Sequence, residues 1–579
     1  MFAKKLPEFA NLVASAEQYS QDAPWMDAAV LVAKNVPIWL AQCSRLYEQP
    51  VAKLSEIPDQ ELQELADRGF NVIWLVGLWE RSAISKKIKR QIGLQEAEAS
   101  AYSIRKYAVA EEWGGEEALV ALRRRAGQYG IRLGADMVPN HTAMDAEWMA
   151  EYPELYLSTD KSPYRQYSFT GQNLSDDPRY EIYLEDHYLD KSDAAVVFKR
   201  VDGETDHVRF IYHGNDGILT PWNDTAQLDF SNAETRAKVI AEMLRIAKQF
   251  SLLRLDAAML LTSQHIQRLW FPPRGETSHI HSRQKHRLSE RAFQKMVPRE
   301  FWQEAIEELN QEAPDTLLLA EAYWMLENFF AHSLGTHRVY NIDFMRLLGH
   351  GKNAQFTKNV KRILAYDPRL LQRRANFLSN PDEEAAAYSF GKGDRFFCLS
   401  TLLATLPGLP IFAHGQVEGY QERYAMDIFK PYLDELPDQT LISEHADKIA
   451  PLLKRRNLFG SVENFHLYDF MGRRGKLHPE VICFSNRNED KRVLVCANNS
   501  AAKVNGKIQD SVPQAVGGFV ESYSLVENLD LLEGTNWKAE DFQFGKTVQL
   551  DTKKINRQGF KLRLKPYETK ILWNFSQDM

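Results

Sequence analysis

Residues 252–259 read LLRLDAAM, an apolar run that ends with two charged side chains, Arg254 and Asp256. Buried strands of parallel sheets are apolar in this way, and the ends of such strands are where a barrel places its chemistry. Seven other short apolar runs alternate with amphipathic helical stretches, at 38–41, 71–76, 131–138, 316–320, 338–341, 376–378 and 409–413. Eight strands of this kind predict an α/β protein built on a closed (β/α)8 TIM barrel.

The spacing of these runs predicts the domains. Residues 1–36 carry apolar side chains at helical spacing and predict an N-terminal helical extension, which a barrel domain follows over 37–460. A long segment separates the third and fourth runs, and we expect an inserted subdomain over 142–222. Beyond residue 460, alternating apolar strands without long helices predict a C-terminal all-β sandwich over 461–579.

The composition argues against several classes of function. The net charge is −7 and no long basic run is present, so nucleic acid is not expected as a partner. No apolar run reaches the roughly 18 residues that a membrane-spanning helix needs. Pro7 and Glu8 interrupt the N-terminal apolar residues, and the four cysteines are dispersed singly, as is typical of reduced thiols. We therefore expect a cytoplasmic protein, whose oligomeric state the sequence leaves open.

Polar and charged side chains end four of the apolar runs. Besides Arg254 and Asp256, they are Asp136, Asn140 and His141 of GADMVPNHT (134–142), Glu321 of LLLAEAYW (317–324) and Asp382 of NFLSNPDEE (376–384). Any one of these charges could be a helix cap or part of a loop ion pair. Because the carboxyl ends of parallel strands meet at one mouth of a barrel, we expect these side chains to lie together.

Two carboxyl groups on adjacent strands suit the cleavage of a glycosidic bond. In a retaining glycosidase one carboxylate attacks the anomeric carbon, while a carboxylic acid about 5–5.5 Å away protonates the departing oxygen. Arg254 lies two residues before Asp256 and on the same face of the strand, so its guanidinium should keep Asp256 ionised, as a nucleophile requires. Glu321 follows an apolar run and should be partly desolvated, which suits a proton donor.

The strand ends DMVPNH, RLD, the Glu after LLLA and NPD resemble the four signature regions of the α-amylase family of glycoside hydrolases, family 13. The order of the strands, the insertion after the third strand and the C-terminal sandwich are similar as well. The resemblance implies that Asp256 is the nucleophile, that Glu321 is the general acid/base, and that Asp382 binds sugar hydroxyls and stabilises an oxocarbenium-like transition state. It also implies substrate contacts, which would come from Arg254, Asp136, His141 and, by stacking on the reacting ring, Tyr102 of ASAYSIRKY (99–107).

The chain departs from the family pattern at two places near the site. Pro381 stands where the family usually has a histidine, and Met259 and Leu260 stand where α-amylases often have a Lys-His pair. Both changes remove polar contacts to sugar, which disfavours starch as the substrate and an ordinary endo-amylase as the activity. Trp222 begins WNDTAQLDF (222–230), which matches none of the family's usual specificity variants; it is either a wall of the sugar cleft or part of the subdomain core.

A metal is not required by the expected chemistry. Asn140 matches a residue that helps to bind calcium in secreted amylases, and Asp176 and Asp177 could assist it, but the family's Asp-rich calcium loop after the first strand is absent. We expect no required cofactor and, at most, a calcium ion that is optional for catalysis.

The sequence thus predicts a retaining α-glycoside hydrolase that acts on short α-glucans or maltooligosaccharides through a covalent glycosyl-enzyme intermediate. One alternative is a transglycosylase of the same family, which would pass a glucosyl or maltosyl unit to a sugar or phosphate acceptor after the same covalent step. Another is a catalytically inactive barrel that serves as a binding module, and the presence of all three carboxylates disfavours it.

Overall fold

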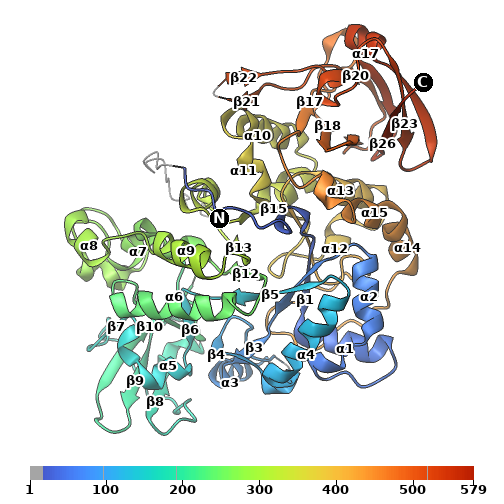
Figure 1. Cartoon of the computed structure of the whole chain (residues 1–579). Helices are drawn as coiled ribbons and strands as arrows, with labels where there is room; N and C mark the ends of the chain where they lie inside the picture. Colours follow the sequence, from blue (N-terminus) through green and yellow to red (C-terminus); the bar gives the residue numbers. More distant parts are fainter. Residues whose placement is uncertain (1–16, 95–96, 191, 219, 518, 579) are drawn as a thin grey trace.

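Eight parallel strands close into a barrel at the centre of the molecule (Figure 1). The computed structural model describes residues 17–94, 97–190, 192–218, 220–517 and 519–578. Around the barrel the strand order is β1-β16-β15-β14-β13-β12-β5-β2. The bounds are β1 Leu31–Asn35, β2 Val72–Val76, β5 Arg132–Met137, β12 Leu252–Leu255, β13 Leu317–Ala320, β14 Arg338–Asn341, β15 Arg374–Phe377 and β16 Leu409–Phe412. The predicted (β/α)8 barrel is confirmed.

The first barrel strand lies earlier in the chain than predicted. The expected strand at 38–41 is wrong, because these residues lie inside helix α1 (Val36–Leu46) and the strand is β1, the LVAKN before it. Asn35 caps the helix by accepting a hydrogen bond from the Ile38 N–H at 3.4 Å, and a proline occupies its first turn. The run IWLA is apolar because α1 is buried against the barrel, so its composition imitates a strand.

The N-terminal helical extension is also contradicted where it can be compared. In residues 17–36 the structure has a single 3₁₀ turn, Met26–Ala28, the strand β1 and the first residue of α1. Residues 1–16, which carry most of the helical spacing, lie outside the described residues. The segment from 17 to 30 is instead a connection without α-helix that leads into the barrel.

Helices cover the outer face of the barrel. The principal ones are α2 (Asp59–Asp67), α4 (Gly115–Gln128), α6 (Ala233–Ala247), α9 (Phe301–Glu312), α10 (Asn353–Tyr366), α13 (Asp394–Thr405) and α14 (Gln439–Lys448). Helix α13 is buried on nearly all sides because the C-terminal strands pack on its outer face. Nowhere in the described part of the chain is a helix long and apolar enough to cross a bilayer.

A separate sheet lies in the segment between β5 and β12 and projects from one side of the barrel, cyan in Figure 1. Its four antiparallel strands have the order β7-β10-β9-β8, with bounds β7 Ser158–Thr159, β8 Tyr180–Tyr183, β9 Val197–Asp202 and β10 Val208–Tyr212. The two ends of the segment are held together by β6 (His141–Ala143), which pairs with β11 (Thr225–Gln227) and sets His141 opposite Gln227.

The C-terminal region is rich in strands and forms a second lobe, orange to red in Figure 1. Its main sheet has the order β17-β18-β19-β26-β23-β24, and β20-β25 and β21-β22 form two-stranded sheets. The bounds are β17 His466–Tyr468, β18 Val481–Asn488, β19 Lys491–Asn498, β20 Val504–Ile508, β21 Gln514–Val516, β22 Phe519–Glu521, β23 Asn536–Asp541, β24 Lys546–Asp551, β25 Phe560–Leu564 and β26 Thr569–Gln577.

Alternate residues of β18 face different cores. Val481 and Cys483 pack inside the C-terminal lobe, whereas Ile482 and Phe484 join the core of the barrel domain. The main sheet is therefore buried on both faces at β18, and the face that carries Ile482 and Phe484 attaches the lobe to the barrel.

Candidate active site

The buried guanidinium of Arg254 joins three carboxyl groups at the carboxyl ends of the barrel strands. Its Nη1 donates to Asp136 Oδ1 at 3.1 Å and to Asp256 Oδ1 at 2.6 Å, and its Nη2 donates to Glu321 Oε2 at 2.7 Å. Strand pairing explains the meeting, since Arg254 lies opposite Asp136 on β5, and β13, which leads into Glu321, pairs with the other edge of β12. Arg254 therefore contacts Asp256, on whose face of the strand its sequence position placed it, and Asp136 as well.

Burial dominates the electrostatics of this group. Asp136 and Asp256 are 2% and 7% exposed, and burial raises the pKa of Asp136 to about 6 and that of Asp256 well above its usual value. The charge of Arg254 opposes both shifts but does not outweigh burial, so the expectation that Arg254 alone keeps the pKa of Asp256 low is wrong. One buried cation faces more carboxyl groups than it can neutralise, so the cluster as a whole favours retention of a proton.

The two oxygens of Glu321 have different surroundings. Oε2 accepts hydrogen bonds from Arg254 Nη2 and from the Ala257 N–H at 2.9 Å, while Oε1 accepts one from the Tyr323 hydroxyl at 3.0 Å. Ala257 has a φ of 43°, in the left-handed region that residues with a Cβ seldom adopt. This strained backbone points an N–H at Glu321, which fits the tendency of backbone strain to occur at functional sites.

Asp382 lies on a loop that Asn380 organises. The side-chain oxygen of Asn380 accepts hydrogen bonds from the Asp382 N–H at 2.9 Å and the Glu383 N–H at 3.1 Å, which is an Asx turn. Pro381 fits between them because the turn asks for no N–H at that position. Burial first, and then the charge of Glu321, raise the pKa of Asp382 to about 6, so the two carboxyl groups act on each other.

Aromatic rings surround the Arg254 guanidinium. Its Cζ lies 5.1 Å from the ring centre of Tyr102, 5.4 Å from that of Trp74 and 5.7 Å from that of Tyr340. Trp74 Nε1 also donates to Asp136 Oδ2 at 3.0 Å. The buried hydroxyls of Tyr102 and Tyr340 have no hydrogen-bond partner among the described residues. Buried hydroxyls are normally paired, so these two are suited to meet hydroxyls of a substrate.

Tyr102 was expected at the site from the sequence, whereas Trp74, Tyr340 and Tyr323 were not. Trp74 and Tyr340 lie within strands, where only the alternation of the strand could show that they face the barrel interior. Tyr323 offered a weak signal, as an aromatic residue two positions after the expected acid.

His141 and Trp222 form the neighbouring wall, with ring centres 5.2 Å apart. Burial lowers the pKa of His141 to about 4, so its ring is neutral at neutral pH and can offer one donor and one acceptor. Trp222 is only partly buried and packs against the core of the barrel domain as well as against His141. Both interpretations of Trp222, cleft wall and subdomain core, stay predictions.

The surroundings of Asn140 do not fit calcium. Its Nδ2 donates to Gln227 Oε1 at 3.2 Å, and its Oδ1 accepts from Gln227 Nε2 at 3.0 Å, so the two amides bind each other. Asp176 and Asp177 pair instead with Lys87 and Arg179. Calcium needs six to eight oxygen ligands, and here the Asn140 oxygen faces an N–H donor. The sequence analysis did not anticipate Gln227, which comes from the TAQLD segment, as the partner of Asn140.

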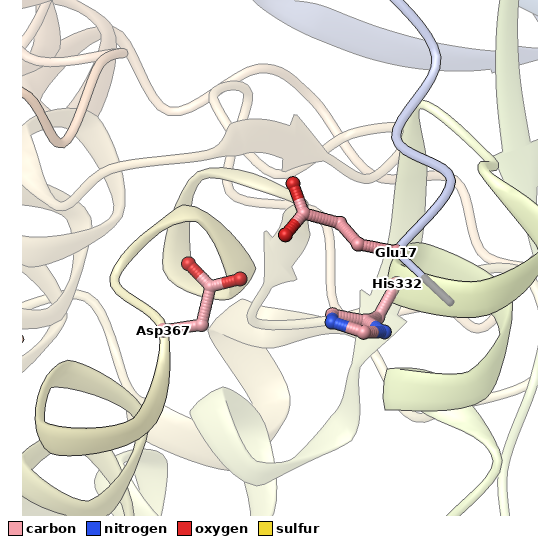
Figure 2. Close-up of side chains that lie close together, drawn as sticks. All are labelled: Glu17, His332 and Asp367. Carbon is pink, nitrogen blue, oxygen red and sulfur yellow. The ribbon is translucent and has the colours of Figure 1, made fainter. Parts of the chain in front are cut away.

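A second group of residues whose side chains can bind metals lies where the N-terminal segment meets the barrel. Glu17, His332 and Asp367 have ligand atoms within 4.8 Å of one another (Figure 2). Arg369, however, ion-pairs with Glu17 and donates to both oxygens of Asp367, through Nε at 3.0 Å and Nη2 at 3.1 Å. The Tyr19 hydroxyl also donates to Asp367, at 2.7 Å. These donors occupy the carboxylates, and the group is an ion-pair cluster rather than a metal site.

Comparisons with known proteins agree with this geometry. The family model described as the α-amylase catalytic domain matches residues 57–446. Maltase A1 of Drosophila melanogaster is 23% identical over 384 residues, which are 62% of this chain and 60% of that protein, so the chain spans less than two thirds of this relative.

Solved structures show the same fold at low identity. The maltogenic α-amylase AmyB from Thermotoga neapolitana has a TM-score of 0.59 at 16% identity, with 95% of this chain and 99% of that chain covered. The debranching enzyme from Nostoc punctiforme has a TM-score of 0.59 at 15% identity, with 96% and 100% covered. Because the catalytic-domain model matches well over half of the sequence, this chain belongs to the α-amylase family of glycoside hydrolases.

Proposed function

We propose that the chain is a retaining α-glycoside hydrolase that acts on short α-glucans or maltooligosaccharides. Asp256 is the nucleophile, Glu321 the general acid/base, and Asp382 the carboxylate that stabilises the transition state. The observation that carries this proposal is the Arg254 bridge, in which Asp256 and Glu321 bind adjacent nitrogens of one guanidinium. In retaining enzymes the two carboxyl groups are about 5–5.5 Å apart, whereas in inverting enzymes they are about 6.5–9.5 Å apart. The bridge supports the closer spacing and therefore a retaining mechanism.

The hydrogen bonds support a role for each carboxyl oxygen in the proposed mechanism. Asp256 Oδ1 is held by Arg254, which leaves Oδ2 to attack the anomeric carbon as the bond to the departing oxygen breaks. Glu321 transfers its proton to that oxygen and then takes a proton from the water that cleaves the glycosyl-Asp256 ester. Arg254 remains cationic throughout and lowers the energy of the carboxylates that form in turn.

Maltose-based substrates are favoured by the names of the similar proteins. One is named a maltase and another a maltogenic α-amylase, and both names place maltose on the substrate or product side. The neutral His141, the partly exposed Trp222 and the unpaired Tyr102 hydroxyl give the mouth the mixture of ring faces and hydrogen-bonding groups that sugars require.

Anomer-resolved NMR of the first product tests the proposal. Purified protein is incubated with maltose, maltotriose, maltodextrin, isomaltose, sucrose, trehalose and maltose 1-phosphate, with and without an added sugar acceptor. We expect α-configured glucose or maltose to appear before mutarotation, and longer products with acceptor would assign transfer rather than hydrolysis. A β-configured first product, or no cleavage of any α-glucoside, would exclude the proposed function.

A further inference from the structure

The hydroxyl of Tyr323 is the one donor to Glu321 Oε1 within the described chain, at 3.0 Å. The other oxygen, Oε2, accepts from the cationic Arg254 and from the Ala257 N–H. A proton on Oε2 would be directed against two N–H donors, so the acid proton belongs on Oε1. Tyr323 therefore touches the oxygen from which the proposed proton transfer starts.

We propose that Tyr323 is a positioning residue for the general acid/base: it holds Glu321 Oε1 toward the glycosidic oxygen and stabilises the carboxylate that remains after proton transfer. In that step the Oε1–H bond breaks and the proton goes to the departing oxygen, while an Asp256 oxygen forms the bond to the anomeric carbon. The Tyr323 hydroxyl can accept from protonated Oε1 and, after rotation, donate to the carboxylate, and it keeps its own proton throughout. The inference rests on the proposed function.

The backbone after Tyr323 is held in an uncommon conformation. Trp324 and Met325 have φ values of 60° and 66°, two successive left-handed residues that both carry a Cβ. Such a conformation is unfavourable for a residue with a Cβ and persists only where neighbours hold the backbone in place. The Trp324 ring stacks on the buried His265 at 5.1 Å between ring centres. The Tyr323 ring packs edge-on against Tyr340 at 6.4 Å. These contacts fix the turn that aims the Tyr323 hydroxyl at Glu321.

The electrostatic surroundings keep Tyr323 protonated. Burial first, and then the negative charge of Glu321, raise the pKa of the phenol well above its usual value, so it stays a donor over the whole working range of pH. The other charged or titratable groups that face this pair are Arg254, Asp256, Asp136, Tyr340 and Asp382.

A Tyr323→Phe variant separates positioning from a structural role when it is assayed on two substrates with the same glycone. Maltose has a basic leaving oxygen that needs the acid, whereas α-glucosyl fluoride needs little protonation. We expect kcat on maltose to fall about 10- to 100-fold, the loss of one hydrogen bond to a charged group, and kcat on the fluoride to fall less than about threefold.

Two further measurements complete the test. In a Glu321→Gln background, Tyr323→Phe should cause no additional loss, since the group on which it acts is gone. Tyr468→Phe removes a buried, hydrogen-bonded hydroxyl from the C-terminal lobe and should leave kcat on both substrates unchanged. Equal losses on maltose and fluoride, or an additional loss in the Glu321→Gln background, would overturn the inference. If the wild-type protein cleaves no α-glucoside, or inverts, it is the proposed function that fails instead.

Discussion

The two ends of the barrel use the same residue types in different proportions. At the carboxyl ends of the strands, one arginine, Arg254, faces several carboxyl groups, and burial raises the pKa of Asp136 to about 6. At the amino ends, Arg338 and Arg373 both pair with the carboxylate of Asp22, and Arg338 also pairs with Asp27 at 3.2 Å. Burial acts to raise the pKa of Asp22, but the two guanidinium groups outweigh it and lower the pKa to about 2.

This difference indicates that the charged groups at the carboxyl ends serve catalysis and those at the amino ends serve stability. An excess of buried carboxyl groups costs free energy of folding and leaves protons to be transferred, whereas an excess of arginine around one carboxylate stabilises its charged form. The mouth also has unpaired hydroxyls on Tyr102 and Tyr340, which await partners from outside the chain. We therefore expect substitutions at the mouth to change turnover and substitutions at the amino ends to change the free energy of unfolding.

The largest effect is expected from Asp256→Asn. A neutral amide cannot form the glycosyl-enzyme ester, so turnover should fall about 10⁴-fold or more on every substrate, including a glycosyl fluoride. Steady-state kinetics on maltose and α-glucosyl fluoride measure this. Asp22→Asn is the comparison from the other end, and below its melting temperature it should keep wild-type turnover. If the Asp256→Asn variant hydrolysed the fluoride, Asp256 could not be the nucleophile.

Arg254→Lys should have the next largest effect, a fall in kcat of about 100-fold, because lysine keeps the charge but cannot bind Asp256 and Glu321 on adjacent nitrogens. The unfolding midpoint in urea should change little. Arg338→Lys is the matched change at the amino end, and we expect it to lower the midpoint and leave kcat intact. If both variants lost activity alike, the two ends would not be functionally distinct.

Asp22→Asn should lower the free energy of unfolding by about 2 kcal/mol at pH 7, which corresponds to the lowering of the Asp22 pKa from 3.8 to about 2. A depressed pKa contributes stability that is fully present above 3.8 and is lost as the pH falls through about 2. The difference between variant and wild type should therefore shrink below pH 3.8. Urea titrations at pH 7, 4 and 2.5 measure it, and a difference independent of pH would contradict the linkage.

Asp382→Asn should have the smallest effect, with the opposite sign. The pKa of Asp382 is raised from 3.8 to about 6, so its contribution to stability is fully present below 3.8 and is lost as the pH rises through about 6. The amide variant should be more stable than wild type by about 1–2 kcal/mol at pH 7, after allowance for partial exposure, and equal to it below pH 3.8. Glu384→Gln, an exposed neighbour on the same loop, serves as the control. A variant that is less stable at pH 7 would show that Asp382 stabilises the fold.

The sequence by itself determined the barrel and the residues that meet at its mouth. Apolar runs and their spacing are local properties of a chain, and in a parallel barrel the ends of such runs must converge, so Asp136, Arg254, Asp256 and Glu321 could be placed together without coordinates. The same local reasoning failed at the first strand, because a buried helix and a buried strand have similar compositions and the Asn35-Pro37 capping signal was overlooked.

The other side-chain contacts could be identified only from the tertiary structure. The amide pair of Asn140 and Gln227, the contact of Tyr323 with one particular oxygen of Glu321, and the Asp22 cluster all depend on how distant segments are oriented. Whether an amide oxygen faces a cation or an N–H group, and whether burial outweighs an ion pair, depends on distances of a few ångströms between residues far apart in the chain. Residue identity and spacing do not encode these distances, because they arise from the packing of the whole molecule.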